Sequence, residues 1–281
     1  MKAETEGTLL AFLVLLALGL EPAVIKANPS NPIGFIALSV FFAAIILWTV
    51  LLTTGRFKEI LEKPAELKRT FLTGLFATAI AYSLYSLGTS MSTAVNSAII
   101  TRLEVFYSLA IGWLLLRERV SGKALAASLL LFGGVFLVLT QGKGITPRKG
   151  DLLLLITPLF WQLGHAVAKF TDYSPLTIAT LRNTFGFLLL LPLALMSGIQ
   201  FMSLALAEGV IIAATQALWY ASISRINLSK ATAILTPAPA LTIAVAIAFL
   251  GEKVGGVYHL LGFLLVTIGT LLIAFEESGT R

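Results

Sequence analysis

The chain has 281 residues, of which 57% are apolar and only 12% are charged, and its mean hydropathy is +0.93. A soluble domain carries about 25% charged residues, so this composition excludes soluble and disordered chains and indicates a membrane protein. The lack of cysteine excludes disulfide frameworks and thiolate metal sites. The net charge of +6 does not indicate nucleic acid, because the 20 Lys and Arg lie mainly in short gaps between apolar segments.

Ten apolar segments follow one another along the chain. An α-helix needs about 20 mainly apolar residues to cross a hydrocarbon core of about 30 Å. The segments are 8–27, 33–54, 71–89, 93–116, 122–140, 151–169, 174–196, 203–223, 228–250 and 256–275. We therefore predict an all-α membrane protein with ten transmembrane helices. The first segment is interpreted as retained and not as a signal peptide, because Glu21 stands where a cleavage site needs a small residue.

The short loops predict the orientation of the chain. The loop 55–69 carries five Lys and Arg, and the loops 117–123 and 225–230 carry others. Positive residues mark the cytoplasmic side, so we expect a multi-pass protein of the inner (cytoplasmic) membrane with both termini in the cytoplasm. The loop 141–150, with three basic residues on the opposite side, is the exception.

Two parts of the chain repeat one pattern. Residues 116–122 reappear as 250–256, and residues 97–101 correspond to 231–235, both at a shift of 134. We predict two repeats, 1–145 and 146–281, with five helices each. Because five is odd, the repeats cross the membrane in opposite directions, which is the inverted topology of many secondary transporters. A receptor or membrane enzyme with an old duplication is the alternative.

The repeated pattern resembles a known family. A glutamate ends the fourth and the ninth helix, a lysine ends the first and the sixth, and an arginine and a proline lie in the seventh and the ninth: Glu118, Glu252, Lys26, Lys169, Arg182 and Pro237. With ten spans in two halves, this set is similar to the drug/metabolite transporter superfamily, and most of all to its EamA-type members. The resemblance implies export of amino acids or similar metabolites. The chain departs from the family at Leu103, where a proline is usual, and at Ser39, where the repeat would place a partner for Arg182.

Helix four carries a polar face. Ser97, Thr101, Glu104 and Ser108 follow the spacing of one helical face, which must point to the bundle interior or to water. A charge in the bilayer costs about 2.5–3.5 kcal/mol, so Glu104 is a candidate to bind a cation or a proton. The alternative is a structural ion pair with Arg182 or Arg102. Two residues span about 200° of an ideal helix, so we do not expect Arg102 and Glu104 to pair with each other.

Matching positions in helices three and eight combine aromatic rings with hydroxyl and amide groups. Such a lining suits an amphipathic organic solute, whereas interfacial aromatic belts are the alternative interpretation. Helix six adds Trp161 and His165, four residues apart on one helical face. The alternative interpretation of His165 is a buried hydrogen-bonding group of the core. The predicted substrate-binding residues are Tyr82, Tyr85, Ser86, Thr101, Glu104, Trp161, His165, Arg182, Gln216, Trp219 and Tyr220.

Other residues are interpreted as structural. Lys26 and Lys169, at helix ends, are expected to reach the headgroups, and Glu118 and Glu252 to complement the N-termini of helices five and ten. Four glycines, Gly133, Gly134, Gly262 and Gly269, suit close packing of those two helices. Such glycines can also support dimerisation, so we expect a monomer or a homodimer.

Enzymatic motifs are absent from the sequence. It contains no H-E-x-x-H, no G-x-S-x-G and no phosphate-binding loop, and its two histidines argue against a catalytic metal. We predict a secondary transporter of small amphipathic metabolites that works by alternating access, without catalytic residues, cofactors or metals. Its partners are a small-molecule substrate, the lipid bilayer and, if Glu104 titrates, protons, but no nucleic acid. A membrane enzyme with a Glu104–His165 acid–base pair and a non-transporting scaffold or receptor are the alternatives.

Overall fold

The computed structural model describes residues 2–116, 121–141, 147–226, 231, 234–235, 237–253 and 256–279. The side chains of residues 2, 116 and 273–279 lie outside that description. Every regular element in these ranges is a helix. Glu118, one of the two repeated glutamates, lies outside the described residues.

The helices follow the predicted segments closely. In chain order they are α1 (Lys2–Ala27), α2 (Pro32–Thr53), α3 (Lys58–Glu62), η1 (Pro64–Glu66), α4 (Leu67–Thr73), η2 (Gly74–Ile80), α5 (Ala81–Ser90), α6 (Ala94–Ile100), η3 (Thr101–Leu103), α7 (Glu104–Leu116), α8 (Gly122–Thr140), α9 (Lys149–Ala168), α10 (Pro175–Ser197), α11 (Ser203–Ile223), α13 (Ala238–Leu250) and α14 (Gly256–Gly279).

Eight helical stretches in the described ranges are long and apolar enough to cross a membrane. They correspond to the first eight predicted spans. The last two predicted spans fall on shorter apolar helices, Ala238–Leu250 and Gly256–Leu272. The all-helical membrane fold is therefore confirmed, with eight spans by length and two shorter helices in the described part of the chain.

Local sequence sets where the helices begin. Asn31 precedes Pro32, and its side-chain oxygen accepts hydrogen bonds from the backbone of Ile33 at 2.9 Å and Gly34 at 3.2 Å. Thr93 caps α6 in the same way, through the backbone nitrogen of Asn96 at 3.0 Å. Proline in the first turn and a polar cap before it are both typical of helix starts, so these boundaries are encoded locally.

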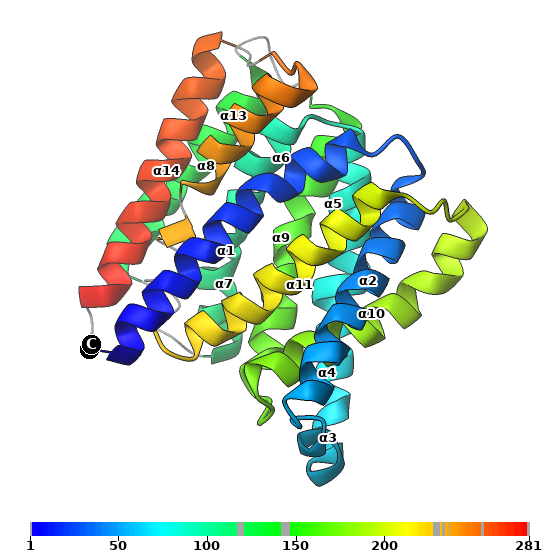
Figure 1. The fold of residues 1–281 in the computed structure, drawn as a ribbon. Helices are drawn as coiled ribbons and strands as arrows, with labels where there is room; N and C mark the ends of the chain where they lie inside the picture. Colours follow the sequence, from blue (N-terminus) through cyan, green and yellow to red (C-terminus); the bar gives the residue numbers. More distant parts are fainter. Residues whose placement is uncertain are drawn as a thin grey trace.

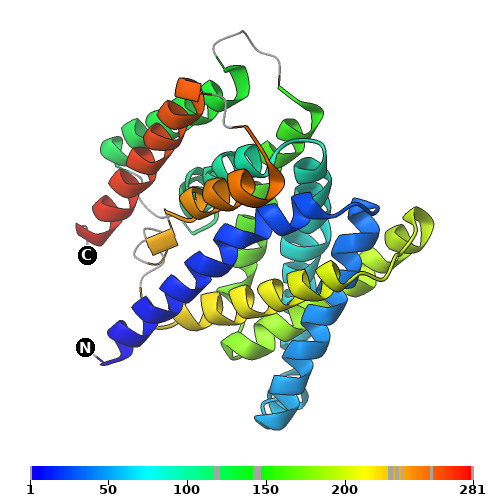
Figure 2. The ribbon, with the colours of Figure 1, turned by 45° about the horizontal axis from the view of Figure 1, so that its top comes forward.

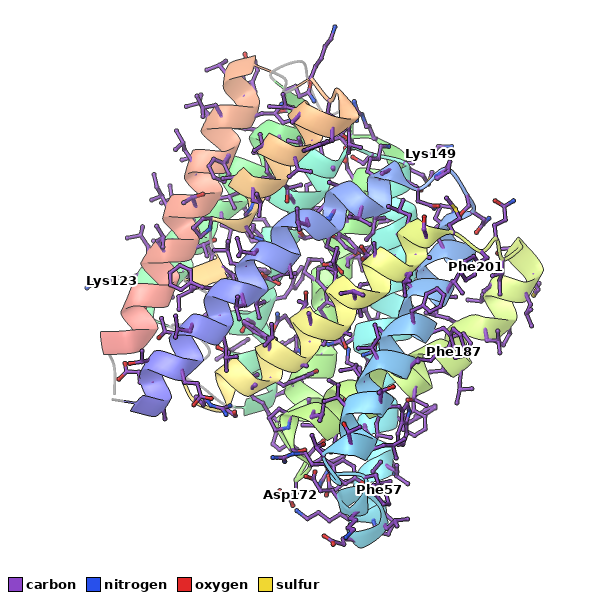
Figure 3. The ribbon with its side chains drawn as sticks, in the orientation of Figure 1. Phe57, Lys123, Lys149, Asp172, Phe187 and Phe201 are labelled. Carbon is purple, nitrogen blue, oxygen red and sulfur yellow. The ribbon has the colours of Figure 1, made fainter. Side chains whose placement is uncertain are left out.

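The helices form one bundle with α1 and α11 side by side across its front (Figures 1 and 2). The pair α8 and α14 forms one edge, and α2, α4 and α10 lie at the other. The start of α1 and the end of α14 lie toward the same end of the bundle as α3. Phe57 and Asp172 mark that end and Lys149 the opposite one (Figure 3), so we call them the Phe57 end and the Lys149 end.

Glycines bring α8 and α14 into contact. A β-carbon on Gly134 would lie 2.6 Å from the carbonyl oxygen of Gly262, and one on Gly269 would lie 2.8 Å from that of Ala127. Only glycine allows such an approach of two backbones, so the predicted packing of these two helices is confirmed. Gly133 takes no part in it, because the space around its α-carbon is open.

Two spans are interrupted where the sequence predicted continuous helices. The third span contains the π-helical segment η2, and the fourth contains the 3₁₀ turn η3 between α6 and α7. Both kinds of interruption occur often at functional sites. The angular positions of residues before and after η3 therefore differ from those on an ideal helix.

Candidate functional site

A cavity of about 100 Å³ lies in the middle of the bundle. Since a water molecule needs at least about 10–15 Å³ on this measure, the cavity has room for several waters or a small solute. Its lining comes from helices of both predicted repeats: Val14, Leu18, Glu21, Pro22, Tyr82, Tyr85, Ala98, Thr101, Arg102, Glu104, Val105, Ser108, Trp161, Gln162, His165, Arg182, Thr215, Gln216, Trp219, Leu235, Pro239 and Thr242.

The structure brings nine of the eleven predicted site residues together on this lining. Two do not line the cavity. Ser86 donates a hydrogen bond to the carbonyl oxygen of Pro32 at 2.9 Å and so joins α5 to α2. Tyr220 lies behind the lining, where its hydroxyl group is 3.3 Å from Nδ1 of His165 and accepts a hydrogen bond from Arg182 at 3.4 Å.

Aromatic rings form one wall of the cavity. The centroids of the Tyr85 and Trp161 rings are 5.0 Å apart, and Tyr82 lies 6.1 Å from Trp161, both in edge-to-face geometry. Trp219 lies 6.4 Å from the ring of His165. Rings in edge-to-face geometry expose apolar ring surface, and Tyr and Trp also carry polar O–H and N–H groups. The wall can therefore offer one ligand both apolar area and hydrogen-bonding groups.

Arg182 places a positive charge beside this wall. Its Nε donates to the Thr78 hydroxyl at 2.9 Å, and its Nη2 donates to the Ala77 carbonyl oxygen at 2.8 Å. Both acceptors belong to η2, whose wide turn leaves a carbonyl group available to a neighbouring helix. Among the described residues no carboxylate forms an ion pair with Arg182, so its charge is available to a ligand.

Glu104 forms an ion pair with Arg102, which the sequence analysis did not expect. Oε1 of Glu104 lies 3.0 Å from Nη1 of Arg102, and both side chains are mostly buried. The expectation was wrong because it assumed an ideal α-helix. Arg102 lies in the 3₁₀ turn η3 and Glu104 directly follows it, so the angle between the two side chains differs from the α-helical value. Glu104 is therefore neutralised by its neighbour and not by Arg182.

Two buried carboxyl groups are not among the residues predicted from the sequence. Glu21 on α1 is 1% exposed and lines the cavity, and Glu208 on α11 is 0% exposed and lies outside the lining. One oxygen of Glu21 and both oxygens of Glu208 have no hydrogen-bond partner in the described structure. The rule that singled out Glu104, an acidic residue inside an apolar segment, applies to both and could have found them.

Several hydrogen-bond donors around the cavity also lack partners. Nε2 of Gln216, Nε1 of Trp219 and Nε of Arg102 are buried and have no acceptor among the residues that the structure describes. Gln216 is held in place by its oxygen, which accepts a hydrogen bond from Asn183 at 2.6 Å. Buried donors without partners are costly in a native protein and are expected where a ligand completes the site.

Comparison with known proteins gives this architecture a family. The sequence matches the model of the EamA-like transporter family over residues 5–140 and again over residues 148–275. The chain belongs to the EamA-like transporter family. The resemblance noted from the repeated glutamates and lysines is thus confirmed, and the protein is a multi-pass membrane transporter.

Two relatives of this EamA-like protein have names that give no substrate. An uncharacterized transporter of Methanothermobacter thermautotrophicus is 29% identical over 151 residues, a match that covers 50% of this chain and 44% of the relative. An uncharacterized protein of Pseudomonas aeruginosa is 25% identical over 237 residues, covering 82% of this chain and 80% of the relative. A protein of known crystal structure matches 99% of both chains with a TM-score of 0.71 and 15% identity, so the two share a fold.

In this EamA-like transporter a polar network closes the bundle near the Lys149 end. Nζ of Lys26 donates to the carbonyl oxygens of Ser90 at 2.9 Å and Ser92 at 2.6 Å. Lys26 thus caps the end of α5 and does not extend to the headgroups, because these carbonyl groups have no partner within their own helix. The expectation for Lys26 was wrong. Lys169 is exposed, and its reach to the headgroups stays a prediction.

Glu252 belongs to the same network. Its carboxylate accepts hydrogen bonds from the backbone nitrogens of Ala94 at 2.8 Å and Val95 at 3.2 Å, the first residues of α6. We expected Glu252 to complement the start of α14, but it caps a helix of the other predicted repeat. The segment that follows α13 is thereby tied to the start of α6.

Asp151, at the start of α9, links further helices to this network. Its carboxylate accepts hydrogen bonds from the Ser92 hydroxyl, from Asn96 Nδ2 at 3.1 Å and from the backbone of Arg148 at 3.0 Å. Asn96 in turn lies 3.0 Å from His259 on α14. The helices α6, α9 and α14 and the turn after α5 therefore meet in one buried polar cluster at this end.

Removal of the Glu252 carboxylate should destabilise this closure. In Glu252→Ala the first two backbone N–H groups of α6 lose their acceptor, which typically costs about 0.5–2 kcal/mol. We expect the midpoint of thermal unfolding of the purified protein to fall by about 1–8 °C, at about 2–4 °C for each kcal/mol lost. The control is Lys253→Ala, which changes an exposed neighbour. Equal midpoints for the two variants would contradict the capping role.

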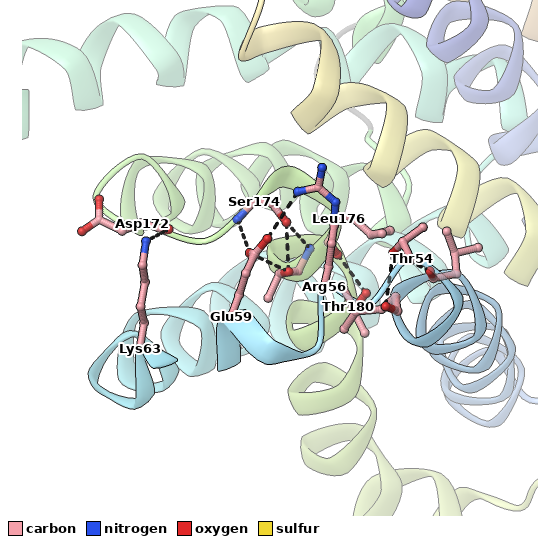
Figure 4. A network of polar contacts seen from close by, with 11 residues as sticks. Thr54, Arg56, Glu59, Lys63, Asp172, Ser174, Leu176 and Thr180 are labelled. Atoms are coloured by element: carbon pink, nitrogen blue, oxygen red, sulfur yellow. Dashed lines mark hydrogen bonds and ion pairs between the residues drawn. The ribbon is translucent and has the colours of Figure 1, made fainter. Parts of the chain in front are cut away.

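At the Phe57 end a second network joins the two predicted repeats (Figure 4). Oε2 of Glu59 accepts hydrogen bonds from the Ser174 backbone at 2.8 Å and the Thr177 hydroxyl at 3.0 Å, and Lys63 donates to the Asp172 carbonyl oxygen at 2.8 Å. Burial raises the pKa of Glu59, but these donors and Arg56 together lower it below its ordinary value. The ionised carboxylate thus holds the α3 loop to the start of α10, and this stabilisation is lost as the pH falls through that lowered pKa.

Proposed function

We propose that this EamA-like protein is a secondary transporter that carries small amphipathic metabolites through the central cavity by alternating access. The proposal includes ten spans in two inverted five-helix repeats, 1–145 and 146–281. It is supported by a cavity whose lining draws on both repeats, with Tyr82 and Tyr85 from one and Trp161, Gln216 and Trp219 from the other. Rocking of two such halves about a shared site exposes it to each side in turn.

The substrate class follows from the unpartnered groups of the cavity. The donors of Gln216 and Trp219 and the charge of Arg182 suit a carboxylate, whereas the free oxygen of Glu21 suits an ammonium group. The aromatic wall adds apolar area for a side chain. A zwitterionic amino acid carries all three features, so amino acids and close analogues are the substrates that this lining fits. This set of unpartnered cavity groups is the observation that carries the proposal.

The alternative functions receive less support from the described geometry. An acid–base pair of Glu104 and His165 requires two groups in reach of each other, but Glu104 is paired with Arg102 and His165 with Tyr220. A non-transporting scaffold would have a filled interior, and this interior contains a cavity.

In the proposed orientation the protein lies in the inner membrane, and its Phe57 end faces the cytoplasm. The loop 55–69, with five basic residues, lies at that end, as does the start of α1. This matches the distribution of positive residues in membrane proteins. Export is the direction that family resemblance suggests. In export, the substrate would enter the cavity from the Phe57 end.

Counterflow in proteoliposomes tests the proposed function. Purified protein is reconstituted in liposomes loaded with a mixture of unlabelled amino acids, and uptake of the same amino acids in labelled form is measured without any ion gradient. Transport predicts transient accumulation of a few members of the mixture. Uptake equal to that of protein-free liposomes for every amino acid, and for amines and organic acids offered in the same way, would contradict the proposal.

A further inference from the structure

We propose that Glu21 and Glu208 together form a proton-exchange site that couples transport to a pH gradient. This inference rests on the proposed transport function and adds to it the group that carries the proton. In this site Glu21 is the carboxyl group that lines the cavity, and Glu208 on α11 is its buried partner.

The two carboxyl groups lie at similar depth in neighbouring helices. Glu21 lies six residues before the end of α1, and Glu208 lies five residues after the start of α11, both toward the Lys149 end. With a rise of 1.5 Å per residue, they are about 9 Å and about 8 Å from those helix ends. α1 and α11 pack side by side, which brings Glu21 close enough for its charge to act on Glu208.

Glu208 is separated from solvent on every described side. A β-carbon on the adjacent Gly209 would touch Phe42 and the carbonyl oxygen of Ser39, so α11 packs directly on α2 at this level. Neither oxygen of Glu208 has a hydrogen-bond donor among the described residues. The route from Glu208 to water therefore leads through Glu21, whose carboxyl group lines the cavity.

The ionisable groups around the pair come from four other elements. Tyr82 and Tyr85 on α5 are within electrostatic reach of both carboxyl groups. Arg102 and Glu104 on η3 and α7, and Arg182 on α10, act on Glu21 from across the cavity. None of these cations forms an ion pair with Glu21 or Glu208 in the part of the chain that the structure describes. On α2, Ser39 and Phe42 provide no ionisable group at the contact with α11.

Two buried carboxylates that form no ion pair cannot both stay ionised here, because like charges repel and burial disfavours each charge. The pair therefore retains one proton. When the ammonium group of a substrate approaches Glu21, the O–H bond of the carboxyl group breaks and water in the cavity takes the proton. The carboxylate then pairs with the ammonium, and the proton returns after the substrate has left. Glu104 does not serve this role, since Arg102 already neutralises it.

Infrared spectroscopy tests the site without a substrate. The purified protein in liposomes is titrated with pH, and the C=O stretching band of protonated carboxylic acids is recorded in H₂O and D₂O. We expect a band at neutral pH that shifts in D₂O and is lost in Glu208→Gln and in Glu21→Gln. Glu104→Gln is the control and should keep the band. A band that persists in both variants, or appears only when sodium is removed, would overturn the proton site.

Transport of labelled amino acids provides the second readout. Glu208→Gln should lose accumulation driven by a pH gradient and keep counterflow, whereas Glu208→Asp should keep both. Equal gradient-driven accumulation by Glu208→Gln and wild type would overturn the coupling. If wild-type protein shows no counterflow at all, the proposed function fails, and the infrared titration still decides whether the pair holds a proton.

Discussion

Replacement of Arg182 with glutamine should reduce counterflow at least about tenfold, because a charged hydrogen bond to a substrate contributes about 1.5–3 kcal/mol. The guanidinium group is buried, and its contacts are with Thr78, the Ala77 carbonyl group and Tyr220. None of these partners carries a negative charge. The positive charge of Arg182 is therefore available to bind the carboxylate of the solute. Glutamine removes this charge and keeps a polar side chain.

Two companion variants separate charge from packing. Arg182→Lys keeps the charge but loses the fork that contacts η2, so it should retain part of the counterflow. Thr78→Val removes one acceptor of Arg182 and leaves the charge, so it should have a smaller effect on transport than Arg182→Gln. Full transport by Arg182→Gln would show that the charge does not contact the solute. Loss of folded protein in Arg182→Gln and Arg182→Lys alike would assign Arg182 a structural role.

Truncation of the aromatic wall should change which solutes are carried. In Tyr85→Ala and Trp161→Ala the wall loses rings whose centroids are 5.0 Å apart, and the cavity grows on that side. We expect larger amino acids to be accepted and the preference for small ones to weaken, measured by competition in the counterflow assay. Because these rings already border a cavity, the loss of stability should stay below the about 3–5 kcal/mol typical of a truncated core aromatic.

Phe35→Ala is the matched control for this prediction. Phe35 is an aromatic residue of similar size, 1% exposed and absent from the cavity lining. Its truncation should lower the unfolding midpoint more than either wall variant and leave the order of substrates unchanged. If the wall variants lose as much stability as Phe35→Ala and keep the wild-type order, the rings serve packing and not recognition.

The sequence predicted the helices and nine of the residues on the cavity lining, because helices and helical faces follow from short-range patterns. Apolar length locates a span, and the spacing of Thr101 and Glu104, or of Trp161 and His165, places side chains on one face. The aligned repeats then brought Tyr82 and Gln216 into the same prediction. The structure gathers nine of these eleven residues around one cavity.

The contacts that sequence could not provide join residues far apart in the chain. Lys26 contacts carbonyl groups 64 and 66 residues away, and Glu252 caps a helix that begins 158 residues before it. Local helix rules apply to neither. The pairing of Arg102 with Glu104 was missed for a different reason, since a 3₁₀ turn between α6 and α7 leaves no clear signal in residue periodicity.

Accessibility of one cysteine tests most directly whether the cavity is the path of an alternating-access transporter. The chain contains no cysteine, and Ala98 is a small residue on the cavity lining, so Ala98→Cys gives a single thiol there. We predict that a membrane-impermeant thiol reagent labels it from either side of uniformly oriented proteoliposomes, and that a transported amino acid slows the labelling. Ala43→Cys, buried on α2 and absent from the lining, should stay unlabelled. Labelling of Ala98→Cys from one side only, at a rate that no solute changes, would contradict the account.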